Sequence, residues 1–439
     1  MSKFKRYERY KDSGVEWIGE IPEHWEINKL KRLSNIITGN TPPKSEEENY
    51  DDEGIPWVKP DNIQDDGTIS ETKERLSVIG LQKARLIPKS SAIVCCIGTV
   101  GKVGFTQEDC TTNQQINSII FERPSIWNNK YGFYCLCSSK NEHEKYSNKV
   151  VVSILNKTQQ GNILMPVPSL KEQKAIASFL DQKTAEIDDL IADKEKLIEL
   201  LQEKRQVIIT EAVTKGLNPN VRMKDSGIEW IGEIPEHWRL SKIKYESLIN
   251  NKTLSESTDD DYEIDYIDIS SVTSIGEIDG VQSLNFKDAP SRARRILSKG
   301  DTIVSTVRTY LKAIAFIENT QSNLICSTGF AVLTPLSKVV PKYLFYLMRS
   351  EKYVNEIVRR SVGVSYPAVN ASDIGDLECA LPDRDEQMYI VEYLDNCTTQ
   401  INQLVNNIQA QIQKLKEYRQ SLISEAVTGK IYVRDYAID

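Results

Sequence analysis

One short segment carries residue types and spacing that could support metal-dependent hydrolysis. Pro60 and Asp61 are followed by Glu71, Thr72 and Lys73, which fits the loose PD…ExK pattern. In nucleases with that pattern, the two carboxylates hold Mg²⁺ and the lysine assists the attacking water. The pattern is short, and the other half of the chain has no counterpart. A Mg-dependent nuclease that uses Asp61, Glu71 and Lys73 is therefore an alternative to be tested, and a surface turn is the simpler interpretation.

The other candidate chemical motifs do not have the spacing that their chemistry requires. The glycine-rich segment Gly98–Gly104 lacks the phosphate-loop spacing and favours a tight strand connection. The three histidines are dispersed, so no Ser-His-Asp set is formed. The eight cysteines are scattered without a C-x-x-C pair, which indicates free thiols and a cytoplasmic location. We therefore predict no catalytic residue, no metal site and no cofactor bound by this chain.

Composition limits the class of protein. The chain has 439 residues, 40% hydrophobic and 27% charged, as in an ordinary globular protein with two or three domains. We expect neither a signal peptide nor a membrane span, since no apolar run is long enough. The formal net charge is -8, so any nucleic-acid binding must use local basic patches or partners that supply positive charge.

An internal repeat organises the chain. The segment Ser13–Trp25 returns as Ser226–Trp238, and the two copies differ only at Val15 and Ile228. A second match at nearly the same shift pairs residues 168–181 with 382–395. The sequence Glu-Ala-Val-Thr closes each copy of the repeat, at 211–214 and at 425–428. Between these matches the two halves diverge over about 130 residues, enough for a separate domain. The sequence therefore predicts a constant frame, written twice, around two unlike inserts.

A long helix is predicted after each insert. A capping residue, a glutamate three residues later and a closing glycine mark its ends: Ser169, Glu172 and Gly216 in the first copy, and Asp383, Glu386 and Gly429 in the second. We expect a coiled-coil seam at apolar positions spaced alternately by three and four: Ile187, Leu190, Leu197, Leu201 and Ile208, and their equivalents Ile401, Leu404, Gln411, Leu415 and Leu422. Lys194, Lys204, Ile408 and Tyr418 are taken as interruptions of this pattern. Two separate amphipathic helices, each on its own domain, are the alternative.

The inserts combine short β-rich runs with helical segments, which predicts a mixed α/β (α+β) fold. The expected organisation is two such domains in tandem, separated by two long helices, with an internal pseudo-twofold repeat. The predicted boundaries are 1–168 for the first domain, 169–215 for the first helix, 216–382 for the second domain, 383–429 for the second helix and 430–439 for a C-terminal tail.

This arrangement resembles the specificity subunit of type I DNA restriction-modification systems. The resemblance rests on the Glu-Trp-Ile-Gly-Glu-Ile-Pro-Glu-His-Trp opening of each half and on the helices that begin P…EQ…I…LD and end EAVT. It implies target-recognition domains that each read half of a bipartite DNA site. It also implies an antiparallel coiled coil that sets the spacer and docks two modification (methyltransferase) subunits.

The same resemblance places the chemistry in partner subunits. S-adenosylmethionine would be bound by the modification subunits, and ATP and Mg²⁺ by restriction subunits, so this chain would be a non-catalytic DNA-recognition subunit. The segment Asn40–Lys44 is the nearest approach to an adenine-methyltransferase motif, and its spacing does not fit. A coiled-coil scaffold protein without DNA specificity is the other alternative.

If the inserts read DNA, basic and amide side chains must contact bases and phosphates. The richest local sets are Lys83, Arg85, Lys102, Gln114 and Gln115 in the first insert, and Arg292, Arg294, Arg295, Arg308 and Lys312 in the second. The four tryptophans of the repeated opening are predicted to bind the partner: Trp17, Trp25, Trp230 and Trp238. For these four, packing against their own domain is the alternative.

Overall fold

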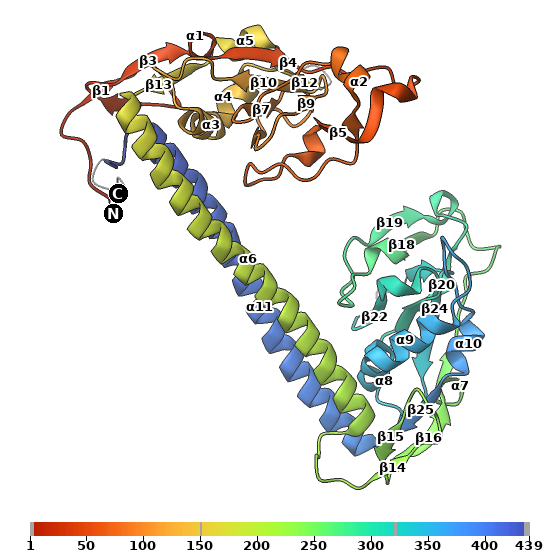
Figure 1. Cartoon of the computed structure of the whole chain (residues 1–439). Helices are drawn as coiled ribbons and strands as arrows, with labels where there is room; N and C mark the ends of the chain where they lie inside the picture. Colours follow the sequence, from red (N-terminus) through yellow and green to blue (C-terminus); the bar gives the residue numbers. More distant parts are fainter. Residues whose placement is uncertain (1–3, 150–151, 320–322, 434–439) are drawn as a thin grey trace. The chain divides into compact units, whose positions relative to one another are not determined.

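The computed structural model describes residues 4–149, 152–319 and 323–433, and the chain divides into two compact units (Figure 1). Unit 1 comprises Met1–Glu195 and Gln409–Asp439, and unit 2 is Lys196–Ile408. Each unit therefore contains one insert together with parts of both long helices. The predicted tail, 430–439, lies outside the described residues from position 434 onward.

Unit 1 is built around two small sheets. The first is antiparallel, with the strands in the order β4 (Asn35–Thr38), β10 (Ile116–Ile120), β7 (Ala92–Cys95) and β8 (Val103–Phe105). Every residue of β7 is buried, as its continuous apolar sequence predicts for a strand covered on both faces. The second sheet has the order β6 (Arg75–Leu76), β5 (Tyr50–Val58) and β9 (Thr111–Thr112). The mixed α/β prediction is confirmed for this insert.

Unit 2 repeats the first sheet and varies the second. The repeated sheet has the order β17 (Ser247–Ile249), β24 (Phe330–Pro335), β21 (Thr302–Ser305) and β22 (Ile314–Phe316). The varied sheet has four strands, in the order β19 (Gln282–Asn285), β18 (Glu263–Ile267), β23 (Leu324–Ser327) and β20 (Ala293–Ile296). The pseudo-twofold repeat therefore extends into the inserts, although their sequences have diverged.

The constant segments form the same strand pairs at the base of each insert. These are β1 (Tyr10–Asp12) with β2 (Glu20–Pro22) and β3 (Glu26–Lys29) with β13 (Leu164–Val167) in unit 1. Their equivalents in unit 2 are β14 (Met223–Asp225) with β15 (Glu233–Pro235) and β16 (Arg239–Lys242) with β25 (Glu378–Leu381). The β3–β13 and β16–β25 pairs join the start of each insert to its end, so the constant frame closes around the variable part.

Both units also contain short helices. In unit 1 they are α1 (Leu30–Leu33), α2 (Val78–Gln82), α3 (Asn129–Ser138), α4 (Lys140–Lys145) and α5 (Lys157–Gly161). In unit 2 they are α7 (Ile243–Glu246), α8 (Pro341–Arg349), α9 (Glu351–Arg360) and α10 (Ala371–Gly375). Pro341 occupies the first turn of α8, where its missing N–H has no cost.

The two long helices are α6 (Leu170–Lys215) and α11 (Arg384–Val427), and they lie antiparallel (Figure 1). Within unit 1, Arg419 Nε donates to Asp188 Oδ1 at 2.9 Å, and Lys194 Nζ donates to Gln411 Oε1 at 2.7 Å. The residue number therefore rises along α6 as it falls along α11. Gly216 and Gly429 follow the helices with φ of +76° and +75°, the left-handed geometry that glycine adopts most easily. The antiparallel coiled coil is confirmed.

The seam of this coiled coil runs one residue away from four of the ten predicted positions. Leu190 and Leu197 are exposed, whereas Ile191 is buried and Ile198 half-buried. In α11 the predicted positions Leu404 and Gln411 are exposed, together with Tyr418. The buried residues of α11 include Ile401, Val405, Ile408, Ile412 and Leu422, so Ile408 belongs to the seam and is not an interruption. The predicted Ile187, Ile401 and Leu422 are correct, and Leu201, Ile208 and Leu415 are half-buried.

Each long helix also places an arginine on the seam, and the two arginines differ in their contacts. Arg419 forms an ion pair with Asp188. The equivalent Arg205 of unit 2 is 9% exposed, and its Nε and one terminal nitrogen have no hydrogen-bond partner. Asn402 stands where the repeat would otherwise supply a second aspartate. Burial removes water from the Arg205 guanidinium and so lowers its pKa.

A buried histidine, His143, lies in α4 of unit 1. His143 is fully buried, its Nδ1 lies 2.8 Å from the Ser139 carbonyl oxygen, and its Nε2 has no partner. A neutral ring that donates from Nδ1 fits this environment. Burial lowers the pKa of His143 from 6.5 to about 4.

His143→Asn is expected to make unit 1 less sensitive to acid. The unfolded chain protonates near pH 6.5 and the folded chain only near pH 4, so the stability from the neutral ring is complete above pH 6.5 and is lost as the pH falls towards 4. The full loss corresponds to about 3 kcal/mol. Asn retains a donor for Ser139 and does not titrate. Urea unfolding at pH 7 and pH 4.5 measures the difference, and an identical pH dependence in both proteins would contradict it.

None of the helices in the described part of the chain is long and apolar enough to span a membrane. All eight cysteines are free thiols. Burial raises the pKa of Cys95 to about 11 and that of Cys110 to about 12, so these two thiols are protonated and unreactive at neutral pH.

Candidate nucleic-acid interface

In unit 1, three loops bring predicted DNA-binding residues to one place. The loop after β4 contacts the other two: Asn40 Nδ2 donates to the Lys83 carbonyl at 2.6 Å, and Thr41 Oγ1 donates to Gln114 Oε1 at 2.5 Å. Arg85 donates to the carbonyl oxygen of Thr38. The loop after β4 approaches the backbone at Thr112 so closely that position 39 requires glycine. A Cβ on Gly39 would lie 2.2 Å from the Thr112 carbonyl oxygen. Lys83, Arg85 and Gln114 are all exposed on this surface.

Not every predicted residue of unit 1 is free to contact a ligand. Lys83 Nζ binds Glu46 and Asn49, and this contact lowers the pKa of Glu46. Gln115 accepts a hydrogen bond from Asn113 Nδ2 at 2.9 Å. Lys102 lies elsewhere, in the turn between β7 and β8, with its Nζ 3.7 Å from Asp65. Arg85 and Gln114 also have partners, Thr38 and Thr41, so all five residues of this set make contacts within unit 1.

In unit 2 the predicted residues form two groups. The first lies on β20 and the turn before it. Arg292 pairs with Asp268 at 3.0 Å, the Arg294 guanidinium lies 4.5 Å from the Phe286 ring centre, and Arg295 donates to Thr253. Arg294 and Arg295 are only half-exposed, and these contacts stabilise their own unit.

The second group lies in the turn between β21 and β22. Arg308 and Lys312 are exposed and flank a short 3₁₀ helix, Thr309–Leu311. Both have left-handed backbone geometry, with φ of 52° and 56°. Arg308 stacks on Tyr366, 4.6 Å from its ring centre. Arg308 and Lys312 therefore lie on a different element from the arginines of β20, and Arg308 has an aromatic neighbour.

The segment with nuclease-like spacing forms a turn. Asp61, Glu71 and Lys73 are exposed, and a bridge between Ile63 and Ile69 closes the turn. In the described residues, no group of three or more His, Cys, Asp or Glu is placed to hold a metal ion.

The same turn occurs in unit 2, closed by a bridge between Val272 and Ile278. In unit 1 the Asp66 carbonyl accepts a hydrogen bond from Arg419 of α11 at 2.9 Å. In unit 2 the Ser274 carbonyl accepts one from Arg349 of α8 at 3.1 Å. The turn is therefore bound by an arginine in each unit, from α11 in unit 1 and from α8 of the same insert in unit 2, which gives the segment a structural role.

A buried glutamate explains why the repeated segments occur together. Glu172 lies in the first turn of α6, 1% exposed, and forms the predicted capping box with Ser169. Its Oε1 is 2.9 Å from His24 Nε2 and accepts the Trp25 indole N–H at 3.4 Å. The His-Trp pair of the opening segment is therefore held by the glutamate of the helix.

Unit 2 repeats this network. Glu386 Oε2 is 2.7 Å from His237 Nε2, and Glu386 Oε1 accepts the Trp238 indole N–H at 3.2 Å. The glutamine after each glutamate binds the backbone just before the next helix of its unit. Gln173 accepts a hydrogen bond from the Asn128 N–H, before α3, and Gln387 accepts one from the Val340 N–H, before α8. These contacts couple the opening segment, the insert and the helix in each copy.

Two of the four tryptophans are not available to a partner, which corrects the prediction for them. Trp25 and Trp238 are 0% and 1% exposed and bind the glutamates of their own units. Trp17 and Trp230 are half-buried, and the Trp230 ring packs edge-on against Tyr353 at 4.9 Å. Only Trp17 and Trp230 remain candidates for partner binding.

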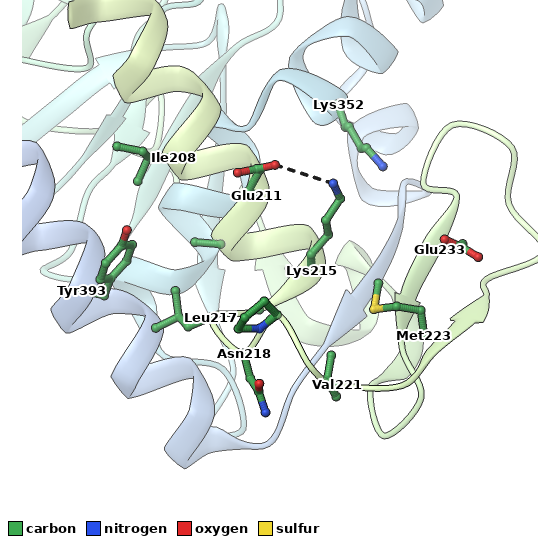
Figure 2. A pocket seen from close by; sticks show the side chains of 13 residues that line it. Ile208, Glu211, Lys215, Leu217, Asn218, Val221, Met223, Glu233, Lys352 and Tyr393 are labelled. Atoms are coloured by element: carbon green, nitrogen blue, oxygen red, sulfur yellow. Dashed lines mark ion pairs between the residues drawn. The ribbon is translucent and has the colours of Figure 1, made fainter.

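Unit 2 contains a hollow of about 700 Å³ where the first helix ends (Figure 2). Glu211 and Lys215, an ion pair at 3.6 Å, lie on one side, and Tyr393 of α11 lies across from them. Tyr393 is 43% exposed, whereas its repeat equivalent Phe179 is covered by the edge of the Phe4 ring at 5.5 Å. The ring at this position of the constant frame is therefore exposed in unit 2, whereas Phe4 covers its equivalent in unit 1.

Sequence reasoning missed several exposed apolar residues. Tyr310, Val362, Val364 and Tyr366 lie beside Arg308 and Lys312, and all four are more than half exposed. No periodicity marks them, because exposure in irregular loops is not readable from spacing. It also missed Glu172 and Glu386 as partners of the His-Trp pairs, although the glutamate and the His-Trp pair both recur at nearly the same shift.

A family described as "Type I restriction modification DNA specificity domain" matches residues 22–200 and again 235–414. The chain is 43% identical over 102 residues to the type I restriction enzyme HindI specificity subunit of Haemophilus influenzae. This match covers 23% of this chain and 22% of that subunit. It is 22% identical to the MjaVIII specificity subunit of Methanocaldococcus jannaschii, over 94% of this chain and 95% of that one.

A solved structure shares the fold. It comes from work on complex assembly and conformational transition of the type I R-M system, and it aligns with a TM-score of 0.66 at 16% identity, over 94% of this chain and 99% of that one. The two family matches together cover well over half of the chain, one on each copy of the repeat. The chain therefore belongs to the type I restriction-modification DNA specificity domain family.

Proposed function

We propose that this chain is the DNA-sequence specificity subunit of a type I restriction-modification complex. Each insert reads one half of a bipartite DNA site, and the paired helices α6 and α11 set the spacer between the halves. The chain itself is not an enzyme, and its role is recognition.

One observation carries this proposal. The family match falls on both copies of the repeat, and the two copies share a frame while their inserts differ. A shared frame suits two copies of one partner, and unlike inserts suit two different half-sites. The varied second sheet, with three strands in unit 1 and four in unit 2, is where the difference is largest.

The proposed partners follow from the same division. Two modification subunits dock on the duplicated frame and bind S-adenosylmethionine, and restriction subunits supply ATP- and Mg²⁺-dependent steps. The net charge of -8 supports this assignment, because partners that surround the duplex can provide part of the phosphate contacts. We also propose a cytoplasmic location, where the eight free thiols stay reduced.

Exchanging residues 34–162 for the insert of another family member should change only one half of the methylated sequence. These limits keep β3, α1 and β13 intact, so the hydrogen bond from the Leu30 N–H to the Ile163 carbonyl is retained. The measurement is genome-wide mapping of methylated adenines in cells that carry the altered chain and its modification partner.

The matched control exchanges residues 247–376 of unit 2 and should change only the other half. A methylating assembly in which either exchange rewrites both halves would contradict independent reading. Absence of sequence-selective methylation by the parent complex would instead support the scaffold alternative.

A further inference from the structure

Two short segments of unit 2 form one exposed element, which we call the tip: residues 308–312 and 361–368. Within the second segment, Val362 and Ala368 exchange backbone hydrogen bonds of 2.8 and 3.0 Å. The Arg308 N–H donates to the Pro367 carbonyl at 2.8 Å, and the hydroxyls of Thr309 and Ser361 are 2.8 Å apart. The segments are therefore tied together by backbone and side-chain bonds.

The tip exposes apolar side chains that a folded domain ordinarily buries. Val364 is fully exposed, Val362 is 80% exposed, and Tyr366 and Tyr310 are 62% and 52% exposed. Several large apolar side chains exposed on one small element mark a surface that another molecule covers.

The charge of the tip indicates which class of molecule covers it. The two segments contain Arg308 and Lys312 and no carboxylate, in a chain whose net charge is -8. Within the described residues, neither cation forms an ion pair. Stacking on Tyr366 leaves the edge of the Arg308 guanidinium free to donate hydrogen bonds in its plane. Cations interleaved with aromatic rings suit a polyanion that also presents flat bases.

The backbone shows that these cations are kept at a cost. Left-handed geometry is unfavourable for residues with a Cβ, yet Arg308 and Lys312 both adopt it. The corresponding turn of unit 1, between β7 and β8, has glycine at its positive-φ positions, Gly98 and Gly101. Strain of this kind at an exposed site is typical of functional residues.

We infer that the tip is a DNA-contact element of unit 2. Arg308 and Lys312 bind phosphate oxygens or base edges, and Val364 and Tyr366 pack against bases or sugars in a groove. The inference rests on the proposed function and assigns this part of the second half-site to named residues.

The test uses the full chain with its modification partner and two DNA duplexes. One duplex carries the mapped methylation site, and the other has the second half-site scrambled. Lys312→Gly keeps the turn geometry and removes one cation, so the slope of log affinity against log salt should fall by about one, with no loss of thermal stability. Val364→Ser with Tyr366→Ser should weaken binding to the intact site about tenfold and leave the salt slope unchanged.

Val281→Ser is the matched control, a valine of the same unit that is 45% exposed outside the tip, and it should bind as the parent does. Parental affinity and salt slope in both tip variants would overturn the inference. So would loss of assembly with the modification subunit, which would make the tip a protein-docking element. If the parent does not distinguish the two duplexes, the proposed function fails first and the inference with it.

Discussion

Ile191→Asp is expected to lower the free energy of unfolding by about 4 kcal/mol at pH 7, because a carboxylate on the buried seam must lose its hydration or take up a proton. Ile191 is 9% exposed between α6 and α11. Its repeat equivalent Val405 is 6% exposed and should behave alike. Denaturant unfolding of the full chain measures the change. Sequence-selective methylation should be lost together with stability.

The neighbouring residues provide matched controls. Leu190 and Leu404 are 44% and 50% exposed, and Asp at either position should change stability by no more than about 0.5 kcal/mol. The sequence alone favoured these leucines over Ile191 and Val405, so the four variants decide between two seams that differ by one residue. Equal effects at neighbouring positions would contradict the packing described above.

Lengthening both long helices by seven residues is expected to widen the spacer between the methylated half-sites by about three base pairs. Seven residues add about 10 Å at 1.5 Å each, and DNA rises 3.4 Å per base pair. The insertions belong after Glu195 and after Ile408, where the division between the two units falls. Seven residues preserve the alternation of three and four along the seam. Adenine methylation mapped in cells gives the spacer directly.

The control places the same seven residues in the exposed connector after Asn218, where the chain becomes longer and the helices do not. The spacer should then stay as in the parent. Full activity with an unchanged spacer in the lengthened-helix protein would show that the partner subunits separate the half-sites. The half-site sequences should be unaffected in both proteins, since no residue of either insert has changed.

The ends and pairing of the helices could be predicted, and the phase of their seam could not. Capping residues and closing glycines have local causes, so Ser169 and Gly216 were readable from the sequence. The phase depends on which of two adjacent apolar residues meets the other helix. Leu190 and Ile191 both satisfy an alternation of three and four, and only the position of α11 decides between them.

The repeated tryptophans show a similar limit. A large aromatic residue written twice suits both a partner surface and a domain base, and residue type does not separate these roles. The structure decides for Trp25 and Trp238, because Glu172 and Glu386 bind their indole N–H groups in the interior. Hydrogen bonds across about 147 residues of sequence leave no local signature.

The candidate DNA contacts were predictable as residue types and only partly as places. Basic and amide residues are common on any surface, and Lys83 and Arg292 prove to be paired with Glu46 and Asp268. The loops that carry Arg85 and Gln114 are distant in sequence, and the loop after β4 brings them together.

The division of the long helices between the units has a consequence for synthesis on the ribosome. Unit 2 is one continuous stretch of chain, whereas unit 1 needs Gln409 onward to complete it. The Tyr131 hydroxyl donates to the Val427 carbonyl at 3.1 Å, and the Tyr432 N–H donates to the Lys5 carbonyl at 2.9 Å. The half that is translated first is therefore finished last, and a chain that stops before Gln409 leaves its earliest-made insert without the second helix of its base.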